Sequence, residues 1–145
     1  MGTTLSLCWV MPGRMLVAHV GDSRVYRWRG GEETALRQLT DDDTRVAALL
    51  RSGKISEYEA RNHPARNMLS KALGAGNQYV FPQVETVELE AGDRFLICSD
   101  GVTDGIWESG IMKLMSDGAD AEQIVDHAVA QSGRDNTTAI VFQID

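Results

Sequence analysis

Residues 92–104 read GDRFLICSDGVTD, an apolar run that ends on an aspartate and a glycine. Residues 94–99 show no polar alternation, which predicts a strand buried on both faces. Asp100 follows directly, so a carboxylate is expected at the end of this strand. A carboxylate beside a buried core is costly unless something positive meets it. The stretch therefore predicts a strand in the core of the fold and a candidate functional site at the end of that strand.

Two further aspartates flank apolar strands in the same way. Asp22 follows residues 16–21 (LVAHVG), and Asp135 precedes residues 136–142 (NTTAIVF). Hard divalent cations such as Mg²⁺ and Mn²⁺ prefer carboxylate oxygens and keep several waters. Gly-Asp and Asp-Gly are also plain turn signals, because Asp bonds its own backbone and Gly accepts a positive φ. Spacing alone leaves the metal site and the turn as open alternatives.

The remaining periodicity predicts many strands, with helices grouped between them. Pro12-Gly13 is a turn dipeptide that joins two apolar runs into a hairpin. Ser56 and Glu59 form a capping-box pattern, and Asp120 caps a later helix. The expected strands are residues 3–11, 14–20, 24–29 (half-exposed), 35–39, 83–89, 94–99 and 137–144, and the expected helices are residues 44–51, 56–63 and 120–131. This order indicates an α+β layered sandwich in a single domain, residues 1–145.

Composition narrows the classes of function. The chain has 145 residues and a net charge of -7, which argues against nucleic acid as a partner and weakly against an anionic membrane surface. Cys8 and Cys98 lie in apolar runs, where free cysteines act as small hydrophobes. No signal peptide or apolar run of membrane-spanning length is visible, so we expect a cytoplasmic protein.

Motifs along nearly the whole chain resemble those of the metal-dependent type 2C protein phosphatase family, in its bacterial serine/threonine branch. Each block alone is a weak signal, and the blocks beginning at Gly21, Gly92 and Asp135 are together highly specific. The motifs are MGTT (1–4), VGDSR (20–24), LTDD (39–42), RNMLSKALG (66–74), GDRFLICSDGVTD (92–104) and RDNTT (134–138).

The resemblance implies two stacked, mainly antiparallel β-sheets flanked by helices. It also implies a Mn²⁺ or Mg²⁺ centre whose activated water attacks a phosphoserine or phosphothreonine of a protein substrate. By motif, Asp100 and Asp135 match the ligands of the first metal, and Asp22 and Asp100 match those of a third, weaker metal. Asn136 matches the asparagine that follows the last ligand and supports it.

The resemblance also implies that something is missing. The family places an arginine-bearing strand and an Asp-Gly-x-Gly-Gly turn before the Gly-Thr-Thr block, and neither occurs in these residues. We therefore expect the sandwich to lack its first strands, impaired catalysis, and self-association through exposed sheet edges. The alternatives are a non-catalytic phosphatase-like module that binds a partner or a cation, and a reading frame that begins too late.

A few other residues carry two interpretations each. Residues 51–56 before His63 resemble a mobile flap, so His63 is either a general acid or a turn histidine. Arg66 either meets a phosphorylated substrate or pairs with a nearby acid. Residues 41–43 (DDD) are either a cation cluster or, as we favour, a solvated helix start. The tryptophans are expected in the core.

Overall fold

The computed structural model describes residues 1–31, 35–74, 76, 79–133 and 135–145. Within these residues seven strands and five helices follow one another in groups along the chain. In order they are β1 (Leu5–Met11), β2 (Arg14–Val20), β3 (Arg24–Trp28), β4 (Leu36–Gln38), α1 (Arg45–Arg51), α2 (Glu57–Arg61), β5 (Gln83–Glu88), β6 (Arg94–Cys98), α3 (Asp100–Gly105), α4 (Glu108–Ser116), α5 (Ala121–Gln131) and β7 (Ala139–Gln143). The predicted strands and helices are all present, with ends shifted by a few residues.

The first sheet is antiparallel, with strand order β1-β2-β5. Pro12 and Gly13 form the predicted turn between β1 and β2, and Gly13 takes a φ of 74° that suits glycine. β1 begins at Leu5 rather than Thr3, because Thr3 instead bridges to Leu73. The hairpin prediction is thus confirmed with a shorter first strand.

The second sheet is antiparallel, with order β4-β3-β6-β7. β6 is buried along nearly its whole length, as its lack of alternation predicted. The expectation of a half-exposed strand at residues 24–29 is wrong, since Val25, Tyr26 and Arg27 are all buried. Both faces of β3 are covered, because Val25 packs in the core between the two sheets and Tyr26 packs in the core against the helices.

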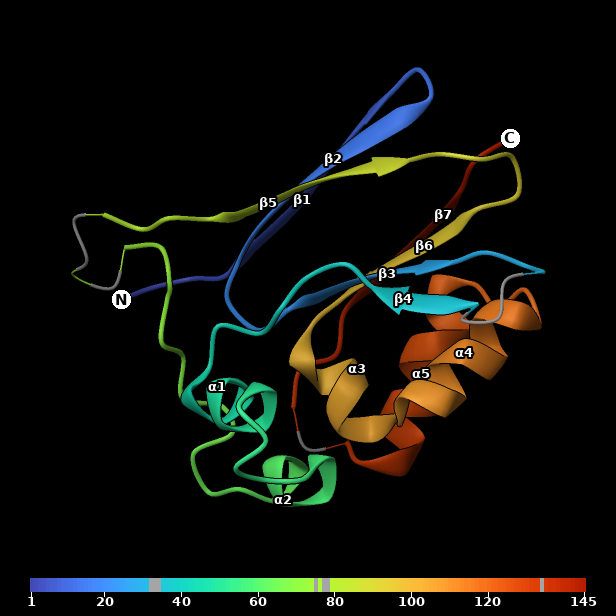
Figure 1. The fold of residues 1–145 in the computed structure, drawn as a ribbon. Helices are drawn as coiled ribbons and strands as arrows, with labels where there is room; N and C mark the ends of the chain where they lie inside the picture. Colours follow the sequence, from blue (N-terminus) through green and yellow to red (C-terminus); the bar gives the residue numbers. More distant parts are fainter. Residues whose placement is uncertain (32–34, 75, 77–78, 134) are drawn as a thin grey trace.

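The chain folds into three layers, with sheet on sheet and helices below (Figure 1). Met15, Val17 and Phe95 belong to the core between the sheets, and Phe95 stacks on Phe142 with ring centroids 5.0 Å apart. Ile111 and Ile124 belong to a second core, where α3, α4 and α5 cover the other face of the four-stranded sheet. The fold is therefore α+β with two stacked antiparallel sheets, as predicted.

The outer face of the β1-β2-β5 sheet carries no helix or strand of the described residues (Figure 1). Trp9 is 62% exposed on this sheet and Trp107, at the start of α4, is 49% exposed, so the expectation of core tryptophans is wrong for both. None of the helices in the described residues has the length and apolar character that a bilayer crossing requires.

α3 and α4 were not predicted from the sequence. α3 has six residues and contains two glycines, so its intrinsic helix propensity is poor. A Cβ on Gly101 would lie 2.5 Å from the Asn136 carbonyl oxygen, and one on Gly105 would lie 2.5 Å from the Ala128 carbonyl oxygen. Close packing on α5 and on the loop before β7, rather than propensity, therefore decides this helix.

Candidate functional site

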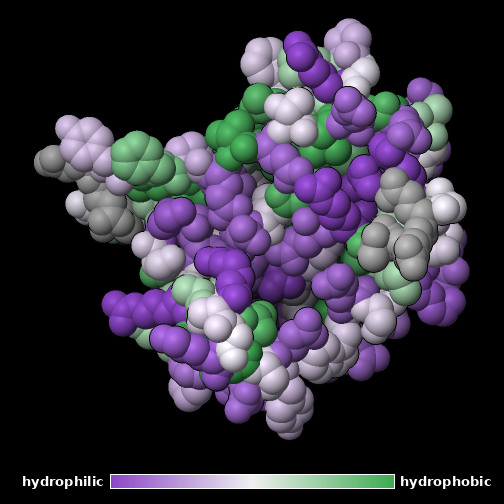
Figure 2. Space-filling model, viewed as in Figure 1, coloured by the Kyte–Doolittle hydropathy of each residue, from purple (hydrophilic) through white to green (hydrophobic). Residues whose placement is uncertain are grey.

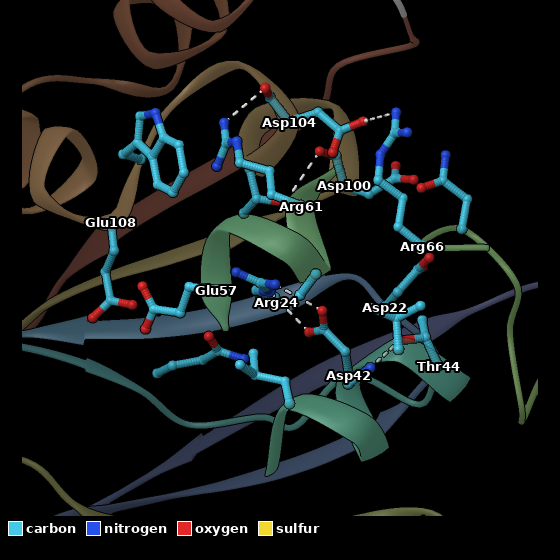
Figure 3. A pocket seen from close by; sticks show the side chains of 18 of the residues that line it. Asp22, Arg24, Asp42, Thr44, Glu57, Arg61, Arg66, Asp100, Asp104 and Glu108 are labelled. Carbon is cyan, nitrogen blue, oxygen red and sulfur yellow. Dashed lines mark hydrogen bonds and ion pairs between the residues drawn. The ribbon is translucent and has the colours of Figure 1, made fainter. Parts of the chain in front are cut away.

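A cavity of about 250 Å³ opens between the turn after β2, the helices α1 and α2, and the start of α3. Figure 2 shows hydrophilic side chains gathered around a hollow on this face. Its charged lining residues come from segments far apart in the sequence (Figure 3). They are Asp22, Arg24, Asp42, Glu57, Arg61, Arg66, Asp100, Asp104 and Glu108.

Asp22 reaches the cavity from a tight turn between β2 and β3. Gly21 takes a φ of +119°, and a Cβ at this position would lie 2.4 Å from Cγ2 of Thr4. Only glycine fits both the dihedral angle and the space. The turn therefore fixes where Asp22 emerges from the buried end of β2.

Asp100 is the first residue of α3, directly after β6. The close approach of Gly101 to the Asn136 carbonyl brings the loop that carries Asp135 next to this helix start. Asp135 and Asn136 are exposed, and neither is among the residues that line the cavity. The loop instead stays attached through Ser99, whose hydroxyl accepts the Thr138 N–H at 3.1 Å.

The electrostatics link the three aspartates. The pKa of Asp22 is raised to about 6, first by burial and then by the nearby charges of Asp100 and Asp42. Burial also raises the pKa of Asp100, followed by the charges of Asp135 and Asp104. The chain therefore concentrates negative charge at one end of the cavity, where a cation would relieve the repulsion.

The donor set fits a hard cation that keeps much of its water. Asp22 and Asp100 both line the cavity, and carboxylate oxygens are the ligands that Mn²⁺ and Mg²⁺ prefer. Across the residues that the structure describes, no three or more His, Cys, Asp or Glu side chains form a group that would hold a metal ion. The arrangement thus resembles an open, partly assembled cation site.

The acidic run at residues 41–43 is not a solvated helix start. Asp42 accepts two hydrogen bonds from Arg24, at 2.8 and 2.7 Å. Asp43 is buried and lies 2.9 Å from Nζ of Lys71, while Thr44 caps α1. The wrong prediction followed from local sequence, because the partners of Asp42 and Asp43 come from distant segments.

The two flap residues are engaged locally. Arg66 lies 3.2 Å from Asp104, as the interpretation of an acid pair predicted. His63 accepts the Ala65 N–H on Nδ1 at 3.1 Å, which is the behaviour of a turn histidine, and it is not among the cavity-lining residues.

Sequence reasoning missed Arg61 and Trp107. Arg61 donates to the Asp104 carbonyl at 2.8 Å and lies over the Trp107 ring at 4.0 Å from its centroid. Arg61 lies in a short predicted helix, and nothing local in the sequence indicates that α2 faces α3 and α4.

Comparisons with known proteins show the family and the fold. The profile of the family "Protein phosphatase 2C" matches residues 1–140. The serine/threonine protein phosphatase PstP of Mycobacterium tuberculosis is 37% identical over 147 residues, which cover 99% of this chain and 28% of that protein. Its relative stp of Listeria monocytogenes is 34% identical over 151 residues, covering 100% of this chain and 58% of that protein.

Solved structures match over the full chain. The crystal structure of the M. tuberculosis phosphatase PstP/Ppp superposes with a TM-score of 0.87 at 35% identity, covering 100% of this chain and 61% of that chain. The PstP catalytic domain in complex with two manganese ions gives a TM-score of 0.84 at 33% identity, covering 100% of this chain and 60% of that chain. The present chain thus spans between about a quarter and three fifths of the length of these relatives.

Proposed function

The chain belongs to the protein phosphatase 2C family, and we propose that it serves the hydrolysis of phosphoserine and phosphothreonine in proteins with Mn²⁺ or Mg²⁺. The observation that carries the proposal is the convergence of Asp22 and Asp100 in one cavity, beside the loop of Asp135. These are the residues that the family resemblance assigns to cations. The solved relative with two manganese ions supports the choice of metal.

Each residue has a distinct part in the proposal. Asp100 and Asp135 would hold a first cation, Asp22 and Asp100 would hold a second, weaker one, and Asn136 would support the loop of Asp135. A divalent cation, when bound, supplies the activation of water for attack on phosphorus. Arg66 and Arg61 bring guanidinium groups to the same cavity, where they can neutralise phosphoryl oxygens. His63 lies outside the lining residues, so the proposal gives it no proton transfer.

We expect residues 1–145 by themselves to be poor catalysts. Their sequence contains no Asp-Gly-x-Gly-Gly turn, and the described residues form no cluster of three metal ligands. Two carboxylates in one cavity hold a hard cation weakly, because most of its coordination is left to water. This same observation favours the second candidate, a phosphatase-like module that binds a cation or a partner without turnover.

The experiment measures Mn²⁺-dependent hydrolysis of p-nitrophenyl phosphate and of a phosphothreonine peptide. Turnover is expected to be low, to need Mn²⁺, and to vanish in Asp100→Asn. The matched control is Asp126→Asn, which changes the same charge on the exposed side of α5. No turnover with ample Mn²⁺ would leave the binding module as the better account.

We also propose that a second copy of the chain pairs with the β1 edge of the β1-β2-β5 sheet. β1 is an edge strand without a charged residue, and such edges template pairing with another chain. On its sheet Leu5, Leu7, Trp9 and Val84 are 46%, 43%, 62% and 60% exposed. Pairing of β1 with the β1 of a second copy would be self-complementary about a two-fold axis.

Sedimentation across a concentration series tests this pairing. The chain is expected to dimerise, and Trp9→Lys is expected to return it to monomer because an edge lysine blocks pairing. Met112→Lys, at a 42% exposed position on α4, should leave the dimer intact. A clean monomer at high concentration would contradict the proposal.

A further inference from the structure

Asp43 is a buried carboxylate that neither lines the cavity nor serves the local helix cap. It is 5% exposed, and Thr44 rather than Asp43 caps α1. Its Oδ2 accepts the Gly21 N–H at 3.1 Å, and its own N–H donates to the Gly21 carbonyl at 2.7 Å. Asp43 thus holds both polar groups of the residue that precedes Asp22.

The same glycine is held from the opposite side by His19. The Gly21 carbonyl only accepts, so Nε2 of His19 donates to it at 3.0 Å, and Nδ1 is left to accept from Ser6, whose Oγ lies 2.9 Å away. His19 is 1% exposed, so this contact is shielded from water. The backbone before Asp22 is therefore fixed by two buried side chains.

Asp43 also ties this turn to the segment at residues 66–73. Lys71 lies 2.9 Å from Oδ1 of Asp43, and the Ser70 N–H donates to the Asp43 carbonyl at 2.7 Å. The Thr44 bridge to Leu69 continues the contact. Any shift of this segment would thus act on the turn of Asp22 through Asp43.

We propose that Asp43 is the positioning residue for Asp22, an inference that rests on the proposed cation site. Asp22 and Asp100 repel one another, so a loosely held turn would swing Asp22 out to water. The two hydrogen bonds that Asp43 makes to the Gly21 backbone, one through Oδ2 and one through its own N–H, prevent that movement. The contacts formed on folding then offset the repulsion between the two carboxylates, so cation binding need not supply that free energy.

The test compares Asp43→Ala with Asp43→Asn, which keeps an acceptor for the Gly21 N–H. Asp41 is exposed and lies three residues before Thr44, the cap of α1, so Asp41→Ala removes the same charge nearby and is the matched control. Calorimetric titration with MnCl₂ measures the dissociation constant. Amide exchange of the metal-free protein measures protection at Gly21. Thermal melts report global stability.

Asp43→Ala is expected to weaken Mn²⁺ binding by about tenfold and to expose the Gly21 amide to exchange. The Mn²⁺ dissociation constant of Asp43→Asn should stay within about threefold of the wild-type value, and that of Asp41→Ala should equal the wild-type value. A residue with only a structural role would lower the melting temperature and leave the Mn²⁺ dissociation constant unchanged. That result in folded Asp43→Ala would overturn the proposal.

Two further outcomes are decisive. If Asp43→Ala does not fold, Asp43→Asn decides the matter. A loss of Mn²⁺ affinity by about tenfold while the Gly21 amide stays protected would overturn the role of Asp43 as the positioning residue for Asp22. Retained Mn²⁺ affinity together with retained protection of Gly21 supports that role. If Asp22→Asn titrates like the wild type, the proposed cation site fails. Exchange at Gly21 would still report whether Asp43 holds the turn.

Discussion

The turn of Asp22 and the loop of Asp135 both place a negative charge near Asp100, but the chain holds them very differently. Gly21 in the turn is buried and is held by His19 and Asp43. Asp135 is exposed, and its loop is tied to the body mainly through Ser99. One carboxylate is therefore set in place by the core, and the other sits on a lightly anchored loop.

The difference teaches where each part of the proposed site gets its order. The turn is ordered by folding, so damage to it should appear first in the free energy of unfolding. The loop makes few buried contacts, so a bound cation should contribute much of its order. Four perturbations separate these two behaviours.

The largest effect is expected from adding one methyl group at Gly21, in the turn, compared with Gly101, the α3 residue against which the Asp135 loop packs. Gly21→Ala meets Thr4 at 2.4 Å with a φ of +119°, and we expect a loss of about 3 kcal/mol in the free energy of unfolding. Gly101→Ala meets the Asn136 carbonyl at 2.5 Å, but the exposed loop can move and alanine favours the helix, so we expect about 1 kcal/mol. Urea denaturation measures both. Equal losses would remove the contrast.

Removing one charge from each carboxylate should affect cation binding in both regions. Asp22→Asn and Asp135→Asn are each expected to weaken Mn²⁺ binding by about tenfold, since each removes a charged oxygen ligand. They should differ in the metal-free protein, where half-buried Asp22 repels Asp100 more strongly than exposed, water-screened Asp135 does, so Asp22→Asn should raise the melting temperature more than Asp135→Asn. Calorimetry and thermal melts give the two readouts, with Asp126→Asn as control. A melting temperature raised as much in Asp135→Asn as in Asp22→Asn would contradict the comparison.

Adding Mn²⁺ should protect the loop more than the turn. Amides of Asn136, Thr137 and Thr138 are expected to exchange several-fold more slowly with saturating Mn²⁺, whereas Gly21 is already protected without it. Hydrogen exchange with and without EDTA measures both segments in one sample. Equal protection of both would mean that the cation orders neither segment selectively.

The smallest expected effect is a pH dependence that comes from Asp22. Its pKa is raised from 3.8 to about 6 in the folded chain, first by burial and then by Asp100 and Asp42. Between these values the folded state binds more protons than the unfolded state, so metal-free stability falls as pH rises from about 4 through about 6. Asp22→Asn should flatten this slope in urea titrations at pH 4.5 and 7. An unchanged slope would show that Asp22 is not the group responsible.

The sequence predicted the elements whose signals are local. The Pro12-Gly13 turn, the capping box of Ser56 and the cap of Asp120 all depend on residues within a few positions of one another, and the structure contains them all. The unbroken apolar run before Asp100 likewise identified the buried strand β6. Local chemistry was sufficient for these features.

What escaped prediction depends on tertiary contacts. α3 forms because Gly101 and Gly105 allow close packing, not because its residues favour a helix. The burial of Asp43 depends on Gly21 and Lys71, which lie far from it in sequence. Trp9 is exposed because no described element covers its sheet, which the apolar pattern of β1 cannot reveal.

The most direct measurement of the central claim is a calorimetric titration of Mn²⁺ into the wild type and Asp100→Asn. Asp100 is the residue that both regions approach, so the account predicts measurable binding in the wild type and its loss in Asp100→Asn. Asp100→Asn should unfold at the same or a higher urea concentration than the wild type, because it relieves the repulsion among Asp22, Asp100 and Asp135, so a loss of Mn²⁺ binding would not come from unfolding. Mn²⁺ binding that is absent from the wild type, or unchanged in Asp100→Asn, would contradict the account.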